Sequence, residues 1–506
     1  MIFAAVALCI GGCTDDASDR PAESPPATAA DYAKASCPTP NLPGYPQLDL
    51  GPEYDCGYLT VPEDRSKTDG RMIKIAVARV QAANSDPEAT PLVYLTGGPG
   101  GTALATAVLQ VAAGINRDRD VVFVDQRGTL HADPFLGCPE IDDFSAEATA
   151  MSIEEASTRD KDLAAVQACR DRLAATGIDL SAYNTAENAA DIAALRVALG
   201  IDEWNVYGVS YGSDLALQLL RDHPEGIRSV VLDSLVPPTD NLMNQFWPSA
   251  AEGYKALFEA CAAQTACAAA YPDLPAEFAA TVTKLAEQPL SVDLPGADGQ
   301  SPRTVVLDGY TFANLVVLLS LSPGNFAGLP GMIHALATGD GVPAATALLT
   351  TFAPKNVVAY GLAYGVFCRE DAAFTTPAEV LDIARRALPL FPDDVLALEP
   401  QAPRLLEECP VWNVGKAADE IHDETTSDVP VVLMAGTFDA VTPPSRADEA
   451  AKTLSNSKVV RFPGLGHDVL AASDCAQTVM ANFLANPDDY DTACAAAMTV
   501  PTFTVG

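Results

Sequence analysis

One serine of this chain lies in a pattern that could make it a nucleophile. Ser210 is at the centre of Gly208-Val-Ser-Tyr-Gly212, between the β-rich run Trp204–Tyr207 and a helical pattern that follows it. A strand, a sharp turn and a helix around G-x-S-x-G hold a serine hydroxyl outward. The pattern alone is weak evidence, because a chain with 34 glycines can match it by chance. This setting favours a nucleophile over an ordinary serine in a glycine-rich turn.

A serine hydroxyl needs a neighbouring base to take its proton, and histidine is the usual one. His467, in Phe462-Pro-Gly-Leu-Gly-His, follows the last β-rich run, where a loop could return it to the serine. We therefore expect His467 to be the base. His131 could also line the site, although a structural role suits it better. The other histidines are expected at the surface: His223, His334 and His422.

An acidic residue must orient the histidine and stabilise its charged form. Asp439 follows the β-rich run Val431–Met434, at what would be the C-terminal end of a strand. Asp233 is a competing candidate after an earlier run. The chain order Ser210, Asp439, His467 is that of α/β-hydrolases. We therefore prefer Asp439 and interpret Asp233 as a structural turn residue.

A glycine-rich turn could supply the donors that stabilise an oxyanion. Thr96-Gly-Gly-Pro-Gly-Gly101 follows the run Leu92–Leu95. Acyl transfer needs backbone N–H groups where the tetrahedral oxyanion forms, and the N–H groups of Gly98 and Tyr211 are the natural pair. Pro99 cannot donate and could fix the turn through a cis bond. The alternative, a phosphate-binding loop, lacks the Gly-Lys-Ser/Thr that should follow.

These residues must be positioned by strands that end at one edge of a sheet. Short apolar runs alternate with alanine-rich helical patterns, which is typical of an α/β fold with a mostly parallel sheet and helices on both faces. Ile73–Val80 alternates loosely and predicts an edge strand. Helical patterns cover Ile153–Ala175 and Ala186–Leu199, the second with Thr185 as its N-cap and Gly200 as its stop.

The alternation stops between about Pro237 and Pro430. This stretch is rich in Ala, Leu and Phe, mostly helical in pattern and interrupted by prolines. An insertion of that length between two late core strands is expected to form a cap or second domain. We therefore predict an α/β-hydrolase core over residues 37–236 and 430–506, with a large, mainly helical cap over 237–429.

The first residues look like an export signal. Residues 2–10 form an uncharged apolar run that is too short to span a membrane. The run ends in Ile10-Gly-Gly-Cys13, which resembles a bacterial lipobox, although no Lys or Arg precedes it. A plain cleaved signal and the end of a buried strand are the alternatives. We predict a signal over 1–12, lipidation of Cys13, and a flexible tether over 13–36 that is rich in Pro, Ala, Ser and acids.

The chain has twelve cysteines, which fits export. Apart from Cys9 and Cys13, ten remain, an even number that could form five disulfides. A metal site finds little support, because there is no C-x₂-C and no histidine at ligand spacing from the cysteines. We predict no metal and no cofactor. Sequential pairing is the simplest of many connectivities: Cys37/Cys56, Cys138/Cys169, Cys261/Cys267, Cys368/Cys409 and Cys475/Cys494.

The 506 residues include 67 acidic against 30 basic ones, which gives a formal net charge of −37. That excess repels phosphate backbones and anionic lipid headgroups, so it argues against nucleic acid as a partner. The hydrophobic fraction of 48% is too high for a disordered acidic chain. We expect an acidic globular protein.

Several motifs occur in one order along the chain: Gly97-Gly-Pro-Gly, Asp125-Gln-Arg-Gly128-Thr, the Ser210 elbow, and Gly-Thr-Phe-Asp439 with Gly-Leu-Gly-His467. Together they resemble the prolyl-aminopeptidase-type serine peptidases of the α/β-hydrolase fold. The length, the large insertion, Cys56 before Val61-Pro62, and Cys409-Pro-Val-Trp412 make the resemblance narrower. It points to the secreted tripeptidyl-aminopeptidase-like branch, over about residues 37–500.

The resemblance implies a cap that blocks the far side of the cleft and binds the free N-terminus of a peptide through carboxylates. Cys368-Arg-Glu370-Asp371 is similar to the cysteine-plus-acid segment of that cap, so Glu370 is the implied amine-binding residue. The alternative is a solvated surface acid. Thr96 departs from the histidine that relatives releasing a single residue carry there. The departure favours a tripeptidyl or broader exopeptidase over a strict proline iminopeptidase.

We therefore expect an exported serine exopeptidase that acts on peptides with a free N-terminus. It would be lipid-anchored to a bacterial membrane or cell surface, or else periplasmic or secreted, and would meet the membrane only through its anchor. Two alternatives stay open. An esterase could use the same residues on small esters, and a lipid-anchored binding protein could carry a decayed hydrolase site.

Overall fold

The computed structural model describes residues 30–38, 50–84, 89–296, 302–351 and 356–505. The predicted signal over 1–12, Cys13 and most of the predicted tether lie outside these residues. Residues Asp31–Lys34 form strand β1, which pairs with β2 (Tyr54–Pro62), so the tether prediction is wrong at its C-terminal end. The strand forms because its backbone completes the edge of the sheet and the Tyr32 ring covers Gly57.

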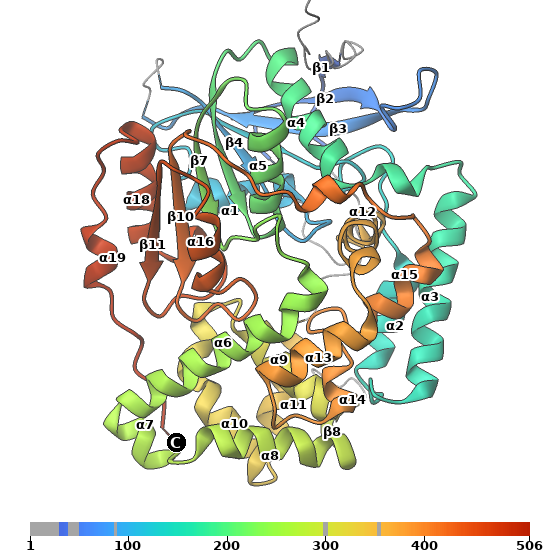
Figure 1. Ribbon diagram of the computed structural model, residues 1–506, viewed down its shortest axis with the longest axis vertical. Helices are drawn as coiled ribbons and strands as arrows, with labels where there is room; N and C mark the ends of the chain where they lie inside the picture. Colours follow the sequence, from blue (N-terminus) through green and yellow to red (C-terminus); the bar gives the residue numbers. More distant parts are fainter. Residues whose placement is uncertain (1–29, 39–49, 85–88, 297–301, 352–355, 506) are drawn as a thin grey trace, which may run out of the picture.

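Nine strands form the main sheet, in the order β1-β2-β3-β5-β4-β6-β7-β10-β11 (Figure 1). The pairs β1–β2, β2–β3 and β3–β5 are antiparallel and the remaining pairs are parallel. The sheet is therefore mostly parallel, as the sequence predicts. After β1 and β2, the strands are β3 (Met72–Val80), β4 (Leu92–Leu95), β5 (Val121–Val124), β6 (Trp204–Val209), β7 (Ile227–Asp233), β10 (Val431–Gly436) and β11 (Ser457–Phe462).

The edge-strand prediction for residues 73–80 is wrong. Strand β3 lies between β2 and β5, and its side chains Ile75 and Val77 are buried. The loose alternation of this strand is misleading because β2, which the sequence analysis did not identify, covers it along its whole length. Strands β4, β5, β6 and β10 are buried at every residue, which explains why they are apolar on both faces.

Helices cover both faces of the sheet. Helices α4, α5 and α16 contribute to the core on one face, and α1, α17, α18 and α19 to the core on the other. Their bounds and those of the remaining helices around the sheet are α1 (Ala103–Ala112), α2 (Pro139–Ala148), α3 (Ala156–Ala174), α4 (Thr185–Ala198), α5 (Tyr211–Asp222), α16 (Pro444–Ala450), α17 (Val469–Ala472), α18 (Asp474–Ala485) and α19 (Ala493–Ala497).

Helix α4 begins at Thr185, and its N-cap is Asn184, whose side chain accepts a hydrogen bond from the Glu187 amide. The prediction of Thr185 as the cap is therefore wrong by one residue. Asparagine is among the strongest N-caps, and Thr185 is instead fully buried inside the first turn. No described helix is long and apolar enough to cross a membrane.

A long insertion separates β7 from β10 and packs around its own core, in which Phe278, Phe312 and Phe326 are buried. In Figure 1 most of its helices lie together below the sheet. The antiparallel pair β8–β9 inside it was not predicted. Its elements are α6 (Leu242–Ala263), α7 (Thr265–Ala270), α8 (Leu274–Glu287), β8 (Leu290–Leu294), β9 (Arg303–Leu307), α9 (Gly309–Leu319), α10 (Leu329–Ala337), α11 (Val342–Thr351), α12 (Tyr360–Val366), a π-helical turn (Phe367–Asp371), α13 (Pro377–Ala387), α14 (Asp393–Leu396) and α15 (Leu405–Trp412).

Ten cysteines of the described chain form five disulfides, and each pairs with its neighbour in sequence. The sequential connectivity is confirmed. The Cys368–Cys409 bond joins the π-helical turn to α15, two elements 41 residues apart. Both elements contribute to the cavity described below, so this bond fixes one of its walls.

Candidate active site

Ser210 lies at the turn between β6 and α5, with φ 56° and ψ −130°. Positive φ is unusual for a residue with a side chain and marks a strained position. The two glycines of this motif, Gly208 and Gly212, have no room for a side chain, because backbone atoms lie too close. A Cβ on Gly208 would lie 2.2 Å from the Gly212 carbonyl oxygen, and one on Gly212 would lie 2.1 Å from that of Leu95. This strained strand–turn–helix geometry is that of a nucleophile elbow.

His467 and Asp439 meet beyond the C-terminal ends of β11 and β10. The Nδ1 atom of His467 lies 2.8 Å from Oδ2 of Asp439. Asp439 is fully buried and also accepts hydrogen bonds from the amides of Val441 and Thr442 at 2.8 and 2.9 Å, and from the Thr442 hydroxyl at 2.7 Å. Four donors on one carboxylate fix its orientation and therefore the orientation of the imidazole.

The electrostatics of this pair favour an ionised carboxylate and an easily protonated imidazole. Burial by itself would raise the pKa of Asp439, but His467 and the Thr442 hydrogen bonds hold that pKa below its ordinary value. Burial by itself would lower the pKa of His467, but the charge and hydrogen bond of Asp439 raise it above its ordinary value. The arrangement stabilises the imidazolium that forms when a histidine acts as a base.

The glycine-rich turn lies directly against Ser210. A Cβ on Gly97 would come within 2.6 Å of the Ser210 Cβ and 3.1 Å of its Oγ. Gly98 has φ 127°, and the bond between Gly98 and Pro99 is cis. Gly98, Tyr211, Ser210 and His467 all line the same cavity. The structure therefore brings the five residues predicted for the reaction, with Asp439 behind His467, to one place.

Asp233, the competing acid, is fully buried and holds the backbone that follows His467. Its carboxylate accepts hydrogen bonds from the Tyr207 hydroxyl at 2.9 Å and from the amides of Val469 and Leu470 at 3.1 and 2.9 Å. Burial and the neighbouring Asp468 raise the pKa of Asp233 to about 7. Asp233 thus holds the first turn of α17, which follows His467 directly.

The other four histidines lie outside the described lining of this cavity. His131 is buried, with Nδ1 2.7 Å from Asp125, and His334 pairs with Glu277. His223 follows the end of α5. His422 is half-buried, and its ring nitrogens lie 2.8 and 2.7 Å from the backbone carbonyl oxygens of Pro238 and Glu370.

Glu370 does not line the cavity with Ser210. Its carboxylate is buried and accepts hydrogen bonds from the amide and the hydroxyl of Thr185, at 2.7 and 2.6 Å. Burial raises the pKa of Glu370 to about 7. The structure thus places this residue at the first turn of α4, where it joins the insertion to the core. Neither a solvated acid nor direct contact with a ligand in the cavity fits this position.

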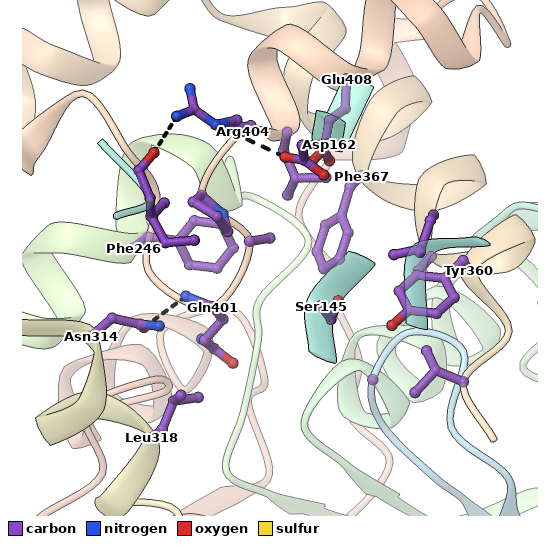
Figure 2. Close-up of a pocket in the computed structure, with 18 of the residues that line it drawn as sticks. Ser145, Asp162, Phe246, Asn314, Leu318, Tyr360, Phe367, Gln401, Arg404 and Glu408 are labelled. Atoms are coloured by element: carbon purple, nitrogen blue, oxygen red, sulfur yellow. Dashed lines mark hydrogen bonds and ion pairs between the residues drawn. The ribbon is translucent and has the colours of Figure 1, made fainter. Parts of the chain in front are cut away.

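The cavity beside Ser210 has a volume of about 480 Å³. Its wall is mostly apolar and includes Phe144, Phe246 and Phe367. A few polar groups interrupt it, among them Asn314, whose side-chain oxygen accepts a hydrogen bond from the Gln401 amide at 2.9 Å (Figure 2). A concave apolar site with few polar groups is typical of a small-ligand pocket.

Two carboxyl groups also line this cavity, and neither was predicted as a site residue. Asp162 on α3 and Glu408 on α15 lie next to each other beside Phe367 (Figure 2). Both residues are buried, and their carboxyl groups share a hydrogen bond. The Tyr364 hydroxyl donates to Glu408 at 2.9 Å, and Nε of Arg404 lies 3.9 Å from Asp162.

Burial raises the pKa of Glu408 well above its ordinary value, and the neighbouring Asp162 raises it further. Burial likewise raises the pKa of Asp162, which Arg404 partly offsets. Two adjacent carboxyl groups cannot both ionise easily, so the pair holds a proton between them. A cation beside the pair could take the place of that proton and form charge-assisted hydrogen bonds or an ion pair with the carboxylates.

The sequence offers only one signal for this pair. Asp162 lies in a densely charged helical pattern, where nothing distinguishes it from solvent-facing acids. Glu408 directly precedes Cys409, and the predicted Cys368–Cys409 bond places it near the segment that carries Phe367. The pairing of Asp162 with Glu408 itself depends on the packing of α15 against α3, which no local pattern encodes.

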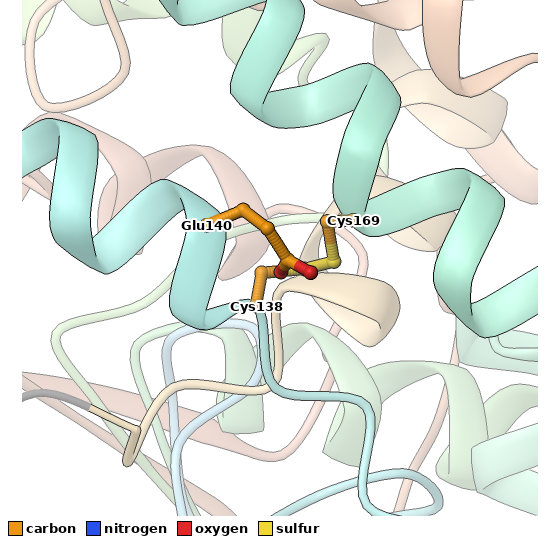
Figure 3. A group of neighbouring side chains, drawn as sticks. All are labelled: Cys138, Glu140 and Cys169. Carbon is orange, nitrogen blue, oxygen red and sulfur yellow. A yellow bond between two sulfur atoms is a disulfide. The ribbon is translucent and has the colours of Figure 1, made fainter.

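One other cluster has the residue types of a metal site. Among the described residues, Cys138, Glu140 and Cys169 place potential ligand atoms close together (Figure 3). The two sulfur atoms form a disulfide, so neither is available as a thiolate. The Glu140 carboxylate binds Arg172 at 2.6 Å. These residues do not fit a metal centre.

The family described as alpha/beta hydrolase fold matches residues 90–304, and the family described as TAP-like protein matches residues 397–494. The strand order, the elbow and these matches make the chain an α/β-hydrolase. Within that fold the chain is similar to proteins named as serine peptidases, among them a tripeptidyl aminopeptidase.

Two named relatives and one solved structure are similar to the chain. The chain is 32% identical to the tripeptidyl aminopeptidase of Streptomyces coelicolor over 199 residues, which is 38% of this chain but only 37% of that protein. It is 25% identical to the serine protease Hip1 of Mycobacterium tuberculosis over 504 residues, 93% of this chain and 92% of Hip1. The solved proline iminopeptidase of Mycobacterium smegmatis is 16% identical, with a TM-score of 0.38, over 85% of this chain and 98% of that one.

Proposed function

We propose that the chain is an exported serine exopeptidase that removes N-terminal residues or tripeptides from peptides with a free N-terminus. The observation that carries the proposal is a single cavity with a serine–histidine site at one part of its wall and a buried carboxyl pair, Asp162 and Glu408, at another. The first could cleave an amide, and the second could bind an ammonium group. The names of the relatives support the same activity.

In the proposed reaction, Ser210 Oγ attacks the peptide carbonyl while His467 takes its proton and Asp439 stabilises the imidazolium. The N–H groups of Gly98 and Tyr211 bind the oxyanion of the tetrahedral intermediate. The intermediate collapses as His467 donates its proton to the leaving amine, which leaves an acyl-enzyme on Ser210. Water then attacks the acyl-enzyme with His467 as base, and this step releases the N-terminal fragment.

In this proposal Asp162 and Glu408 take the role that the sequence analysis assigned to Glu370. The peptide ammonium group would lie beside the pair, displace its shared proton and donate two charge-assisted hydrogen bonds to the carboxylates. The cavity of about 480 Å³ lies in the range of sites that enclose a drug-sized ligand, roughly 300–1,000 Å³. Its mostly apolar wall supports a short peptide with apolar side chains as the acyl group.

We also propose that residues 237–429 act as the cap of this site. Phe246, Tyr310 and Leu318 of the insertion line the same cavity as the core residues Ser210 and His467. A wall from the insertion would limit how much peptide can extend beyond the N-terminal fragment. Export agrees with five disulfides, which persist in oxidising compartments. Lipidation of Cys13 stays part of this proposal.

The test is to incubate the purified protein with an unlabelled decapeptide and follow the products by mass spectrometry. The proposal predicts short fragments released in order from the N-terminus, and no release by Ser210→Ala. Internal cleavage would contradict the exopeptidase. Hydrolysis of p-nitrophenyl esters without any peptide cleavage would instead support the esterase.

A further inference from the structure

The glycine-rich turn is held at both ends by two consecutive residues of one strand end. After β5, Gln126 donates a hydrogen bond from Nε2 to the Thr96 carbonyl oxygen at 2.8 Å, at the start of the turn. Asp125 accepts hydrogen bonds from the Thr102 hydroxyl and the Leu104 amide, both at 3.0 Å, at its end. Asp125 and Gln126 together thus fix both ends of the turn that carries Gly98.

The turn needs such external support. Four of its six residues are glycines, which rotate freely through positive and negative φ. Within the turn itself, the Gly101 amide donates to the Gly97 carbonyl at 3.2 Å. The Thr96 carbonyl oxygen also lies against the elbow, since a Cβ on Gly212 would approach it to 2.8 Å. A rotation at Thr96 would therefore shift Gly97 and Gly98 relative to Ser210.

Gln126 is kept in an arrangement that stability alone does not explain. It is buried, and its Oε1 atom has no hydrogen-bond partner. A buried unsatisfied oxygen is unfavourable, so an apolar residue of the same shape would suit the fold about as well. The amide group is useful here for the N–H that reaches Thr96.

We infer that Gln126 is a positioning residue for the oxyanion site: its side-chain amide holds the Thr96 carbonyl so that the Gly98 N–H points at the developing oxyanion. This inference rests on the proposed serine peptidase function. It assigns Gln126 no contact with substrate, since Gln126 is absent from the lining of the cavity. Its effect is therefore expected on the transition state and not on substrate binding.

The chain supplies a matched control. Gln110 on α1 is also buried, also donates one hydrogen bond from Nε2, to the Tyr94 hydroxyl at 3.3 Å, and also has an unsatisfied Oε1 atom. Within the described part of the chain, its side-chain hydrogen bond goes to Tyr94, outside residues 96–101 of the turn. Gln110→Met and Gln126→Met thus remove the same groups from equally buried positions, and only the second releases the turn.

The experiment compares wild-type protein, Gln126→Met, Gln110→Met and Ser210→Ala on one free tripeptide anilide. Removal of a direct oxyanion donor costs roughly 100- to 1,000-fold in kcat, so release of the residue that aims one should cost roughly 10- to 100-fold in Gln126→Met. We expect KM and the melting temperature of this variant to stay near the wild-type values. Inhibition by a peptide aldehyde, which forms a tetrahedral adduct with serine, should weaken by the same factor as kcat.

Three results would overturn the inference. The first is wild-type kcat in Gln126→Met, and the second is a loss of kcat matched by an equal loss in Gln110→Met. The third is an unchanged affinity for the aldehyde in spite of a lower kcat. Failure of the proposed function looks different, because Ser210→Ala would then be as active as the wild type or no variant would cleave the substrate.

Discussion

The Nδ1 atom of His467 lies 2.8 Å from Oδ2 of Asp439, a carboxylate that is completely buried and accepts three further hydrogen bonds. Because these donors keep Asp439 ionised, its charge raises the pKa of His467. The same contact fixes the tautomer of the imidazole, with the proton on Nδ1 and Nε2 free to accept. The pH dependence of the reaction should therefore report this pair.

His467 must be neutral to accept the proton of Ser210, so its protonation at low pH removes activity. Since the pKa of His467 is raised above its ordinary value of about 6.5, kcat/KM should fall as the pH decreases through a midpoint above that value. Asp439→Asn removes the charge, so the midpoint should move down and the plateau should fall by about 10,000-fold. The measurement is a kcat/KM profile from pH 5 to 9 for both proteins, and an unchanged midpoint in Asp439→Asn would contradict this role.

Glu408→Gln should weaken the binding of free N-termini. The substitution keeps the shape of the side chain but removes a group that could bear negative charge beside Asp162, so kcat/KM for a free tripeptide substrate should fall roughly 10- to 100-fold, mainly through KM. Steady-state kinetics on one free substrate and on its N-acetylated form test this. The acetylated substrate has no ammonium group and should be affected much less.

Glu407→Gln is the control for that variant, because Glu407 lies next to Glu408 on α15 but contacts Arg159 and Arg404 instead of lining the cavity. It should leave KM unchanged.

The stability of the Glu408 variant gives a second readout. The raised pKa of Glu408 means that the folded state binds a proton that the unfolded state releases, so stability falls as pH rises. Glu408→Gln should therefore melt at the same or a higher temperature at pH 8, and a large loss of stability would indicate a structural role.

Gly97→Ala should lower activity by on the order of 100-fold without unfolding the chain. The added Cβ would lie 2.6 Å from the Ser210 Cβ and 2.9 Å from the Val209 carbonyl oxygen, so the turn must move away from the nucleophile. A displacement of about 1 Å in such a site costs on the order of 100-fold in rate. Gly328→Ala is the control, because nothing lies within 4 Å of the added Cβ there. Equal activity of both variants in the peptide assay would disprove the close approach of the turn to Ser210.

Removal of the Cys368–Cys409 disulfide should change substrate binding as well as stability. The bond is flanked by Phe367 and Glu408, which both line the cavity. A Cys368→Ala/Cys409→Ala variant should lose about 2–5 kcal/mol of unfolding free energy and show a raised KM. The matched variant Cys475→Ala/Cys494→Ala should lose stability while KM stays unchanged, because that bond joins α18 to α19, away from the cavity. Denaturant unfolding and kinetics on the two variants measure both effects.

The site residues that could be predicted from the sequence are those marked by a motif of a few neighbouring residues. Ser210 is identified by Gly208 and Gly212, where an added Cβ would lie 2.2 and 2.1 Å from backbone oxygens. Because only glycine fits at both positions, the local geometry appears in the sequence as a pattern of five residues. His467 and Asp439 each follow an apolar run that could be read as a buried strand. The chain order of these three then suffices to predict the α/β-hydrolase fold.

Features that depend on distant packing were not predictable in the same way. The Asp162–Glu408 pair comes from α3 and α15, which the sequence separates by more than two hundred residues. The segment around Glu370 resembles one that binds a ligand, but the Glu370 carboxylate accepts hydrogen bonds from the amide and the hydroxyl of Thr185. The β8–β9 pair lay in a stretch read as helical, because its strands of five residues are too short to dominate the surrounding helical pattern.

The central claim is that a serine site and an ammonium site share one cavity. The most direct test is kcat/KM for two tripeptide anilides that differ only in an acetyl group on the N-terminus. We predict efficient release of the dye from the free substrate, at least roughly 100-fold slower release from the acetylated one, and no release from either by Ser210→Ala. Equal rates on the free and acetylated substrates would contradict the exopeptidase, and activity retained in Ser210→Ala would contradict the mechanism.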